Sequence, residues 1–209
     1  MRPHEIKLEP EKVYHIYNRA HGSEKLFLNE NHYYEFLQKY ALYIPPIADT
    51  LAYCLLPNHF HLMVKLKDPH FIEVPDFNEV SYSSKISKQF GKLFSSYSQW
   101  FNLKTERKGG LFMSGFKRKP VEDPFYFTEL LGYIHTNPVK HGLVEDAMDW
   151  TFSSIHAYAL NDTSSKSGTS MKCHTDIILD FFGGSKEDML DFHRNYSEKV
   201  VEMQGLGLE

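Results

Sequence analysis

The chain has 209 residues, of which 42% are hydrophobic and 15% aromatic, and its formal net charge is −4 at pH 7. This length and composition predict one folded domain with at most a small appendage, and they exclude an intrinsically disordered chain. The two cysteines lie far apart and the N-terminus is charged, which predicts a cytoplasmic protein with free thiols. No apolar stretch approaches the roughly 18 residues needed to span a membrane, so we expect no membrane partner.

Residues 13–20 are rich in aromatic and β-branched types and end at a His-Gly-Ser turn, so we expect a strand there. Apolar residues then recur at helical spacing over residues 29–44, with Asn29 as the N-cap and two prolines at the end. Two extended segments follow at 50–56 and 59–66. Only Pro57 and Asn58 separate them, which predicts antiparallel neighbours.

The second half of the chain begins with an expected loop at residues 68–78 and a long amphipathic helix from 83 to about 108, closed by two glycines. Residues 111–121 are extended and basic, and 124–136 form a helix that we expect Asn137 and Pro138 to end. Residues 176–182 and 185–203 are predicted to form a small helical tail, with Ser185 and Asp188 spaced as a capping box.

This order of elements predicts an α+β fold in which helices pack on an antiparallel sheet, with a ferredoxin-like topology as the preferred arrangement. We expect one domain at residues 1–160, a linker or exposed loop at 161–175, and a small helical C-terminal tail at 176–209. The tail receives no role beyond covering or tethering the domain.

Basic residues are concentrated in one part of an otherwise mildly acidic chain. A locally positive groove can bind a polyanion even when the net charge is negative, although a solvated helix face is the common alternative. The basic residues between positions 85 and 119 are Lys85, Lys88, Lys92, Lys104, Arg107, Lys108, Lys117, Arg118 and Lys119.

His59 and His61 lie two residues apart on an expected strand, so both side chains leave the same face while Phe60 and Leu62 leave the other. Two imidazoles on one face form half of a metal site. The alternative is a pair of partly buried histidines satisfied by hydrogen bonds, and the pair alone does not decide between the two.

Tyr133 and Asn137 lie four residues apart, one helical turn, so they can share a face. A tyrosine attacks a phosphate when a divalent cation offsets the charge of the transition state, and an amide oxygen is a suitable third ligand beside two imidazoles. The alternatives are an ordinary core tyrosine and an asparagine that precedes a helix-ending proline.

Several motifs occur together in a characteristic order. They are PNHFHLMV, the basic GLFMSGFKRKPVED, YIHTNPVKHGLV and the closing WTFSS at residues 150–154. Over roughly residues 13–158 the chain resembles the REP-associated tyrosine transposases, relatives of the insertion-sequence transposases in the HUH (His-hydrophobic-His) nuclease superfamily. The resemblance implies the same ferredoxin-like fold.

The resemblance also implies a chemistry. His59, His61 and Asn137 would hold a divalent metal, Mg²⁺ or Mn²⁺, and Tyr133 would be the nucleophile. The substrate would be single-stranded DNA bearing a hairpin, cleaved and rejoined through a 5′-phosphotyrosine, by a monomer or a homodimer. Our candidates for DNA contacts are Lys85, Lys88, Lys92, Lys117, Arg118, Lys119 and Lys140.

Two other functions stay open. A non-catalytic hairpin DNA- or RNA-binding relative has no need of the four motif residues, which counts against it. A zinc hydrolase built on the His59 and His61 pair needs further His or Asp ligands, and the sequence shows no such set.

Overall fold

The computed structural model describes residues 4–72, 82–159 and 173–205. Residues 161–172 of the predicted linker (161–175), residues 73–78 of the expected loop (68–78) and the chain end at 206–209 lie outside these ranges. Among the described helices, none is long and apolar enough to cross a membrane. Cys54 and Cys173 are both buried free thiols, as the sequence predicted.

A four-stranded antiparallel sheet in the order β2-β3-β1-β4 forms the centre of the protein. Its strands are β1 (Val13–Arg19), β2 (Ala48–Leu56), β3 (His59–Leu66) and β4 (Lys117–Pro120). Helix α1 (Glu30–Tyr43) connects β1 to β2, and α2 (Tyr82–Thr105) lies between β3 and β4. This βαββαβ order with its strand arrangement is the ferredoxin-like topology, so the fold class is confirmed.

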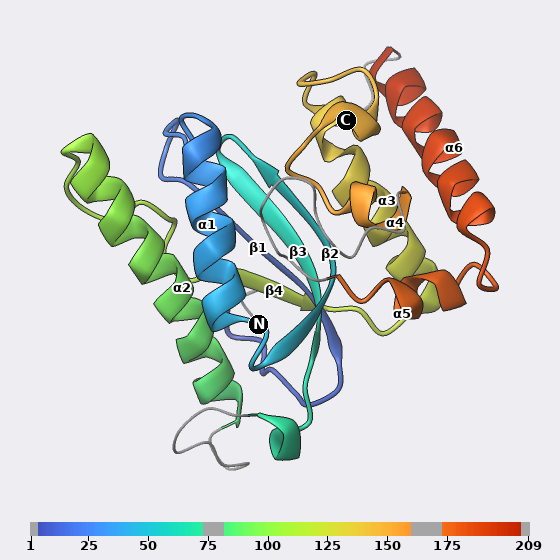
Figure 1. The fold of residues 1–209 in the computed structure, drawn as a ribbon. Helices are drawn as coiled ribbons and strands as arrows, with labels where there is room; N and C mark the ends of the chain where they lie inside the picture. Colours follow the sequence, from blue (N-terminus) through green and yellow to red (C-terminus); the bar gives the residue numbers. More distant parts are fainter. Residues whose placement is uncertain (1–3, 73–81, 160–172, 206–209) are drawn as a thin grey trace.

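Helices α1 and α2 cover one face of the sheet (Figure 1). Phe60 and Leu62 of β3 point to this face and are fully buried against Phe36 of α1 and Tyr97 of α2. The α1 helix ends just before the two prolines, as predicted. This core is apolar and aromatic, which leaves the opposite face of the sheet for polar groups.

The opposite face is covered by the remaining helices, which are α3 (Pro124–Lys140), α4 (Ile155–Ala159), α5 (Thr175–Asp180) and α6 (Lys186–Gly205) (Figure 1). Short 3-10 turns lie at Pro69–Phe71 and Ala147–Asp149. Met63 of β3 packs here with Ile134 of α3, Ile178 of α5 and Met189 of α6. The C-terminal helices thus contribute side chains to the second core.

Helix α6 packs closely along α3. A Cβ atom at Gly132 would lie 2.6 Å from the ring of Tyr196, so the approach of the two helices requires a glycine there. His135 Nδ1 of α3 lies 2.7 Å from His193 Nε2 of α6, and its Nε2 atom lies 2.8 Å from the Ser154 hydroxyl. A buried polar contact therefore joins the tail to the centre of the protein. At the start of α6, Asp188 N donates to Ser185 Oγ at 3.1 Å, the backbone half of the expected capping box.

The expected end of α3 at Asn137 and Pro138 is wrong, because the helix continues to Lys140 with Pro138 inside it. Pro138 lacks an amide hydrogen, so one helical hydrogen bond is lost. The Asn137 side chain donates to the Tyr133 carbonyl at 3.2 Å, and Gly142, with φ 62°, closes the helix one turn later. Asn137 is consequently an interior helix residue.

The long helix also ends differently from the prediction, at Thr105 rather than near Lys108. Glu106 adopts a left-handed backbone, φ 55°, and Arg107 N donates to Asn102 O at 3.0 Å, so the turn closes before the glycines. Of the extended segment at 111–121, only β4 is a strand, and Phe112 adds an isolated bridge to Ala20.

Candidate active site

The histidine pair and the tyrosine meet between β3 and α3. His59 and His61 point to the α3 face of the sheet, since Phe60 and Leu62 occupy the other. The ring of Tyr133 lies against His61, with centroids 5.2 Å apart and planes at 77°. Asn137 follows one turn further along α3. The structure therefore brings together the four residues that the motifs singled out.

His61 is held by a second histidine. His61 Nδ1 lies 2.9 Å from Nε2 of His15, which sits on the adjacent strand β1. Among the described residues, His61 Nε2 is buried without a hydrogen-bond partner. Burial, followed by the charges of His15 and His59, lowers the pKa of His61 well below its ordinary value, so its ring is neutral at pH 7 and keeps a lone pair.

His59 is oriented in a similar way. Its Nδ1 atom lies 2.7 Å from Asn58 Oδ1, which can only accept, so Nδ1 carries the proton and Nε2 keeps the lone pair. Burial, followed by the charge of His141, lowers the pKa of His59 to about 4, with the Asn137 amide acting in the opposite direction. Both imidazoles are therefore in the state that binds a metal.

The third predicted ligand, Asn137, has a side chain that interacts with His59. Its Nδ2 atom donates to the Tyr133 carbonyl, and its Oδ1 atom is buried with no partner among the described residues. Two neutral imidazoles and an unpaired amide oxygen fit a divalent cation. No group of three or more His, Cys, Asp or Glu side chains within the described ranges could hold a metal, and the predicted set differs because its third member is an amide.

A pocket of about 420 Å³ opens beside Tyr133 and His61. Tyr17 of β1, Lys119 of β4 and Tyr196 of α6 also line it, together with Tyr126 and Glu129 of α3. A second hollow, of about 280 Å³, lies on the His59 side and is lined by Lys25, Asn58 and His141. The histidine pair thus lies between two hollows.

The predicted DNA-contact residues of β4 fall on two faces, because strand side chains alternate. Lys119 lines the pocket, and Lys117 Nζ lies 5.7 Å above the ring of Tyr17 on the same face. Arg118 points to the α2 side, is 9% exposed, and donates to Ser87 Oγ at 2.6 Å. Arg118 is therefore not brought to the site and joins β4 to α2.

The lysines of α2 also lie away from the site. Lys85, Lys88 and Lys92 belong to the helix that covers the opposite face of the sheet, and Lys88 and Lys92 are exposed there. Lys140 is exposed at the end of α3, next to His141, whose ring lies 5.0 Å from that of His59. Lys117, Lys119 and Lys140 are thus the predicted basic residues placed nearest the four motif residues.

Sequence reasoning did not identify His15, Tyr17, Glu129 or Tyr196 as site residues. His15 and Tyr17 alternate along β1 with the buried Tyr14 and Ile16, so the strand pattern could have shown that they share a face. Their pairing with β3 is a long-range contact that the sequence does not contain.

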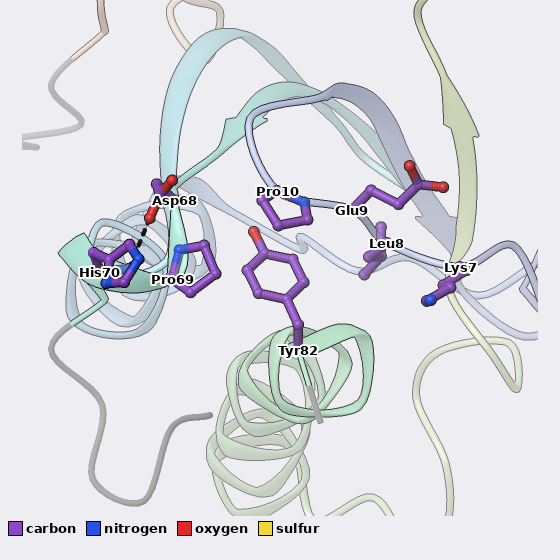
Figure 2. Close-up of a pocket in the computed structure, with 8 residues that line it drawn as sticks. All are labelled: Lys7, Leu8, Glu9, Pro10, Asp68, Pro69, His70 and Tyr82. Carbon is purple, nitrogen blue, oxygen red and sulfur yellow. Dashed lines mark hydrogen bonds between the residues drawn. The ribbon is translucent and has the colours of Figure 1, made fainter. Parts of the chain in front are cut away.

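The pocket drawn in Figure 2 is a different one, with a volume of about 340 Å³. Its walls are residues 7–10, which precede β1, residues 68–70, which follow β3, and Tyr82 of α2. Because His59 begins β3, this pocket lies at the opposite end of the strand from the motif residues. It contains none of the predicted site residues.

A ferredoxin-like sheet with an HUH pair beside a helix tyrosine is the arrangement that the resemblance implied. No family model matches the sequence. The chain is 32% identical over 113 residues to a Haemophilus influenzae protein named "Putative REP-associated tyrosine transposase", and the match covers 52% of this chain and 59% of that one.

The solved structure of a REP-associated tyrosine transposase bound to a REP hairpin has the same fold. It superposes with a TM-score of 0.50 at 18% identity and covers 74% of this chain and 82% of that chain. A bacterial tRNA(His) guanylyltransferase-like protein in complex with ATP overlaps less, with a TM-score of 0.39 at 13% identity over 71% of this chain and 70% of that one. The resemblance to REP-associated tyrosine transposases is therefore confirmed by sequence and by fold.

Proposed function

We propose that this protein is a transposase-like enzyme that binds single-stranded DNA bearing a hairpin and cleaves and rejoins it through a 5′-phosphotyrosine on Tyr133. The carrying observation is the pair of buried, unpaired ligand atoms, His61 Nε2 and Asn137 Oδ1, beside the Tyr133 ring. Buried polar atoms normally have partners, so unpaired ligand atoms on two of the three predicted metal-binding residues support a bound group. The homologue and the structural neighbour, both named as REP-associated tyrosine transposases, support the reaction class.

His59, His61 and Asn137 would hold the divalent cation. When bound, a Mg²⁺ or Mn²⁺ ion supplies positive charge for the non-bridging phosphate oxygens, which lowers the barrier to attack. The protein orients these side chains before a cation binds. Asn58 and His15 fix the rings of His59 and His61, and the lowered pKa values keep both rings neutral.

Tyr133 provides the nucleophile. Its oxygen forms a bond to phosphorus while the bond to the 3′-oxygen breaks, the phenol proton leaves to water in the open pocket, and the 3′-oxygen takes a proton. The phosphotyrosine conserves the bond energy, so the freed 3′-hydroxyl can reverse the reaction and rejoin a strand. His135 cannot take the Tyr133 proton, because it is fully buried between His193 and Ser154.

The experiment is incubation of the protein with a hairpin-bearing single strand and Mg²⁺ or Mn²⁺, followed by a denaturing gel. A protein-linked DNA band in wild type that is absent from Tyr133→Phe supports the proposal. Binding without any adduct at any metal concentration would instead identify a non-catalytic hairpin-binding relative. Cleavage without an adduct would identify a hydrolase with a water nucleophile.

A further inference from the structure

We infer that the pocket beside Tyr133 is a subsite for one unpaired base of the DNA strand, and that it prefers a base with an amino group to thymine. The inference rests on the proposed function, since it places the strand next to the Tyr133 nucleophile. It assigns a role to Tyr126, Glu129 and Tyr196, which the cleavage chemistry itself does not use.

The first observation is the aromatic wall of the pocket. Rings of Tyr17, Tyr126, Tyr133 and Tyr196 surround a space of about 420 Å³. A single strand binds proteins mainly by stacking its bases on aromatic side chains and by placing its phosphates against basic groups. Each ring comes from a regular element, β1, α3 or α6, so the walls are in place before a ligand arrives.

The second observation is the charge around the pocket. Lys119 Nζ lies 3.9 Å above the ring of Tyr126, and Lys117 Nζ lies 5.7 Å above that of Tyr17. Both lysines are exposed, and their side chains lie on the pocket side of β4. These two cations suit the phosphates of a strand whose base enters between the rings.

The third observation is the carboxylate of Glu129, which lines the same pocket. Burial, followed by the charge of Glu129 and a hydrogen bond with it, raises the pKa of Tyr196 to about 12, so the Tyr196 hydroxyl is protonated and donates to this carboxylate. A carboxylate inside the pocket repels a phosphate. It accepts hydrogen bonds from the amino groups of cytosine, adenine or guanine, whereas the carbonyl oxygens of thymine face it unfavourably.

The C-terminal helix completes this pocket. Tyr196 of α6 is seated over Gly132 of α3, and His193, one turn earlier, is tied to His135. The tail therefore supplies a wall of the subsite in addition to covering α3.

The test measures fluorescence anisotropy of labelled oligo-dC and oligo-dT, each about 12 nucleotides, within the range of single-strand site sizes. EDTA prevents cleavage, so binding alone is followed. Wild type is expected to bind oligo-dC about fivefold or more tightly than oligo-dT. Glu129→Gln should remove most of that preference, while Glu145→Gln, an exposed carboxylate away from the pocket, should leave it unchanged.

The ring variants test stacking. Tyr126→Leu and Tyr196→Leu should each weaken binding by about 5- to 100-fold, the loss expected for one stacked base. Tyr196→Phe should retain binding, because the ring remains. Phe125→Leu, at a ring that is 71% exposed outside the pocket, is the matched control. Melting temperatures of all variants separate lost stacking from lost folding.

Equal binding by Tyr126→Leu and Phe125→Leu, or equal affinity of wild type for the two oligonucleotides, would overturn the subsite. If wild type still forms a covalent adduct with hairpin DNA, the proposed function survives that result. If wild type binds neither oligonucleotide, the subsite is overturned, and adduct formation with hairpin DNA decides the proposed function separately.

Discussion

The Nε2 atom of His15 lies 2.9 Å from Nδ1 of His61, across neighbouring strands β1 and β3. Burial lowers the pKa of His15 to about 3, so its ring is neutral at pH 7 and can accept the His61 Nδ1 proton. That contact leaves the lone pair on His61 Nε2, which is buried without a hydrogen-bond partner among the described residues. We therefore regard His15 as a positioning residue for the proposed metal ligand His61.

Replacing His15 with leucine should weaken divalent-metal binding by about 10- to 100-fold, the usual cost of losing a partner behind a ligating histidine. The measurement is the rise in melting temperature as Mg²⁺ or Mn²⁺ is titrated, which does not depend on activity. His70→Ala, at an exposed histidine in the distant pocket of Figure 2, is the control. An unchanged metal dependence in His15→Leu would show that His15 serves only the fold.

His59→Ala and His61→Ala should each abolish cleavage and remove the metal-dependent rise in melting temperature. A site filled at 100 times its dissociation constant stabilises wild type by about 2.7 kcal/mol. Asn137→Ala should weaken the metal response in the same direction, because it deletes the unpaired oxygen. No metal-dependent shift in wild type near neutral pH would refute the ligand assignment.

The basic residues divide into groups with different expected effects. Lys117→Gln combined with Lys119→Gln should reduce the salt slope of single-strand binding by about 1.4, since each phosphate contact contributes about 0.7. Arg118→Gln should leave the slope unchanged and lower the melting temperature, because its guanidinium donates to Ser87 across the β4–α2 boundary. Salt titrations of DNA affinity measure the first effect, and thermal unfolding measures the second.

The lysines of α2 provide the comparison. Lys88→Gln with Lys92→Gln removes two exposed charges from the opposite face of the sheet, and the salt slope should not change. If the salt slope falls as much as it does in the Lys117 and Lys119 double variant, the DNA strand also contacts α2.

Much of this arrangement could be predicted from local pattern. The His59 and His61 pair was placed correctly because alternation along one strand decides which face a side chain takes. The same rule separates Arg118 from Lys117 and Lys119, although the basic run was first treated as one group. Helical spacing likewise placed Tyr133 and Asn137 on one face of α3.

The remaining features depend on distant parts of the chain. His15 meets His61 only through the register of β1 and β3, which are separated by 46 residues along the sequence at this contact. Tyr196 reaches the pocket because α6 packs on α3 over Gly132, a contact that neither helix specifies by itself. Helix α3 passes Pro138 because this part of the helix is buried on all sides, so tertiary packing outweighs the local preference of proline.

Acid should destabilise the protein through its buried histidines, among which His135 and His193 contribute together with His15, His59 and His61. Burial lowers the pKa of His193 to about 4 and lowers that of His135 well below its usual value, with the nearby His156 adding to the latter. The unfolded chain takes up these protons below about pH 6.5, so the free energy of unfolding should fall as pH drops from there toward 4 and stay level above it. Each histidine contributes about 1.4 kcal/mol per pH unit.

Urea unfolding at a series of pH values measures this dependence. His193→Gln should unfold more easily at pH 7 and show a shallower fall below pH 6.5, because one titrating group is gone. His70→Gln, at an exposed histidine, should match wild type. A slope in His193→Gln equal to that of wild type would contradict the contribution of His193 to the acid response.

Tyr133→Phe should bind hairpin DNA and metal as wild type does and form no covalent adduct. The substitution deletes one oxygen and keeps the ring that packs against His61 at 5.2 Å. In wild type, one DNA fragment should carry a free 3′-hydroxyl and the other should carry protein on its 5′-phosphate. Gel analysis with each end labelled in turn distinguishes the fragments, and peptide mapping locates the link.

Peptide mapping has structurally reasonable competitors for Tyr133, namely the three other tyrosines that line its pocket, Tyr17, Tyr126 and Tyr196. Tyr97 and Tyr158 are buried, and their hydroxyls donate to the carbonyls of Leu26 and Leu51, so neither can reach a phosphate. Tyr126 lines the same pocket as Tyr133. A link on Tyr126 would place the nucleophile on a different side of the pocket and would leave the reaction class unchanged. Full cleavage by Tyr133→Phe without an adduct would show that water attacks the phosphate, and Tyr133 would then be a wall of the pocket alone.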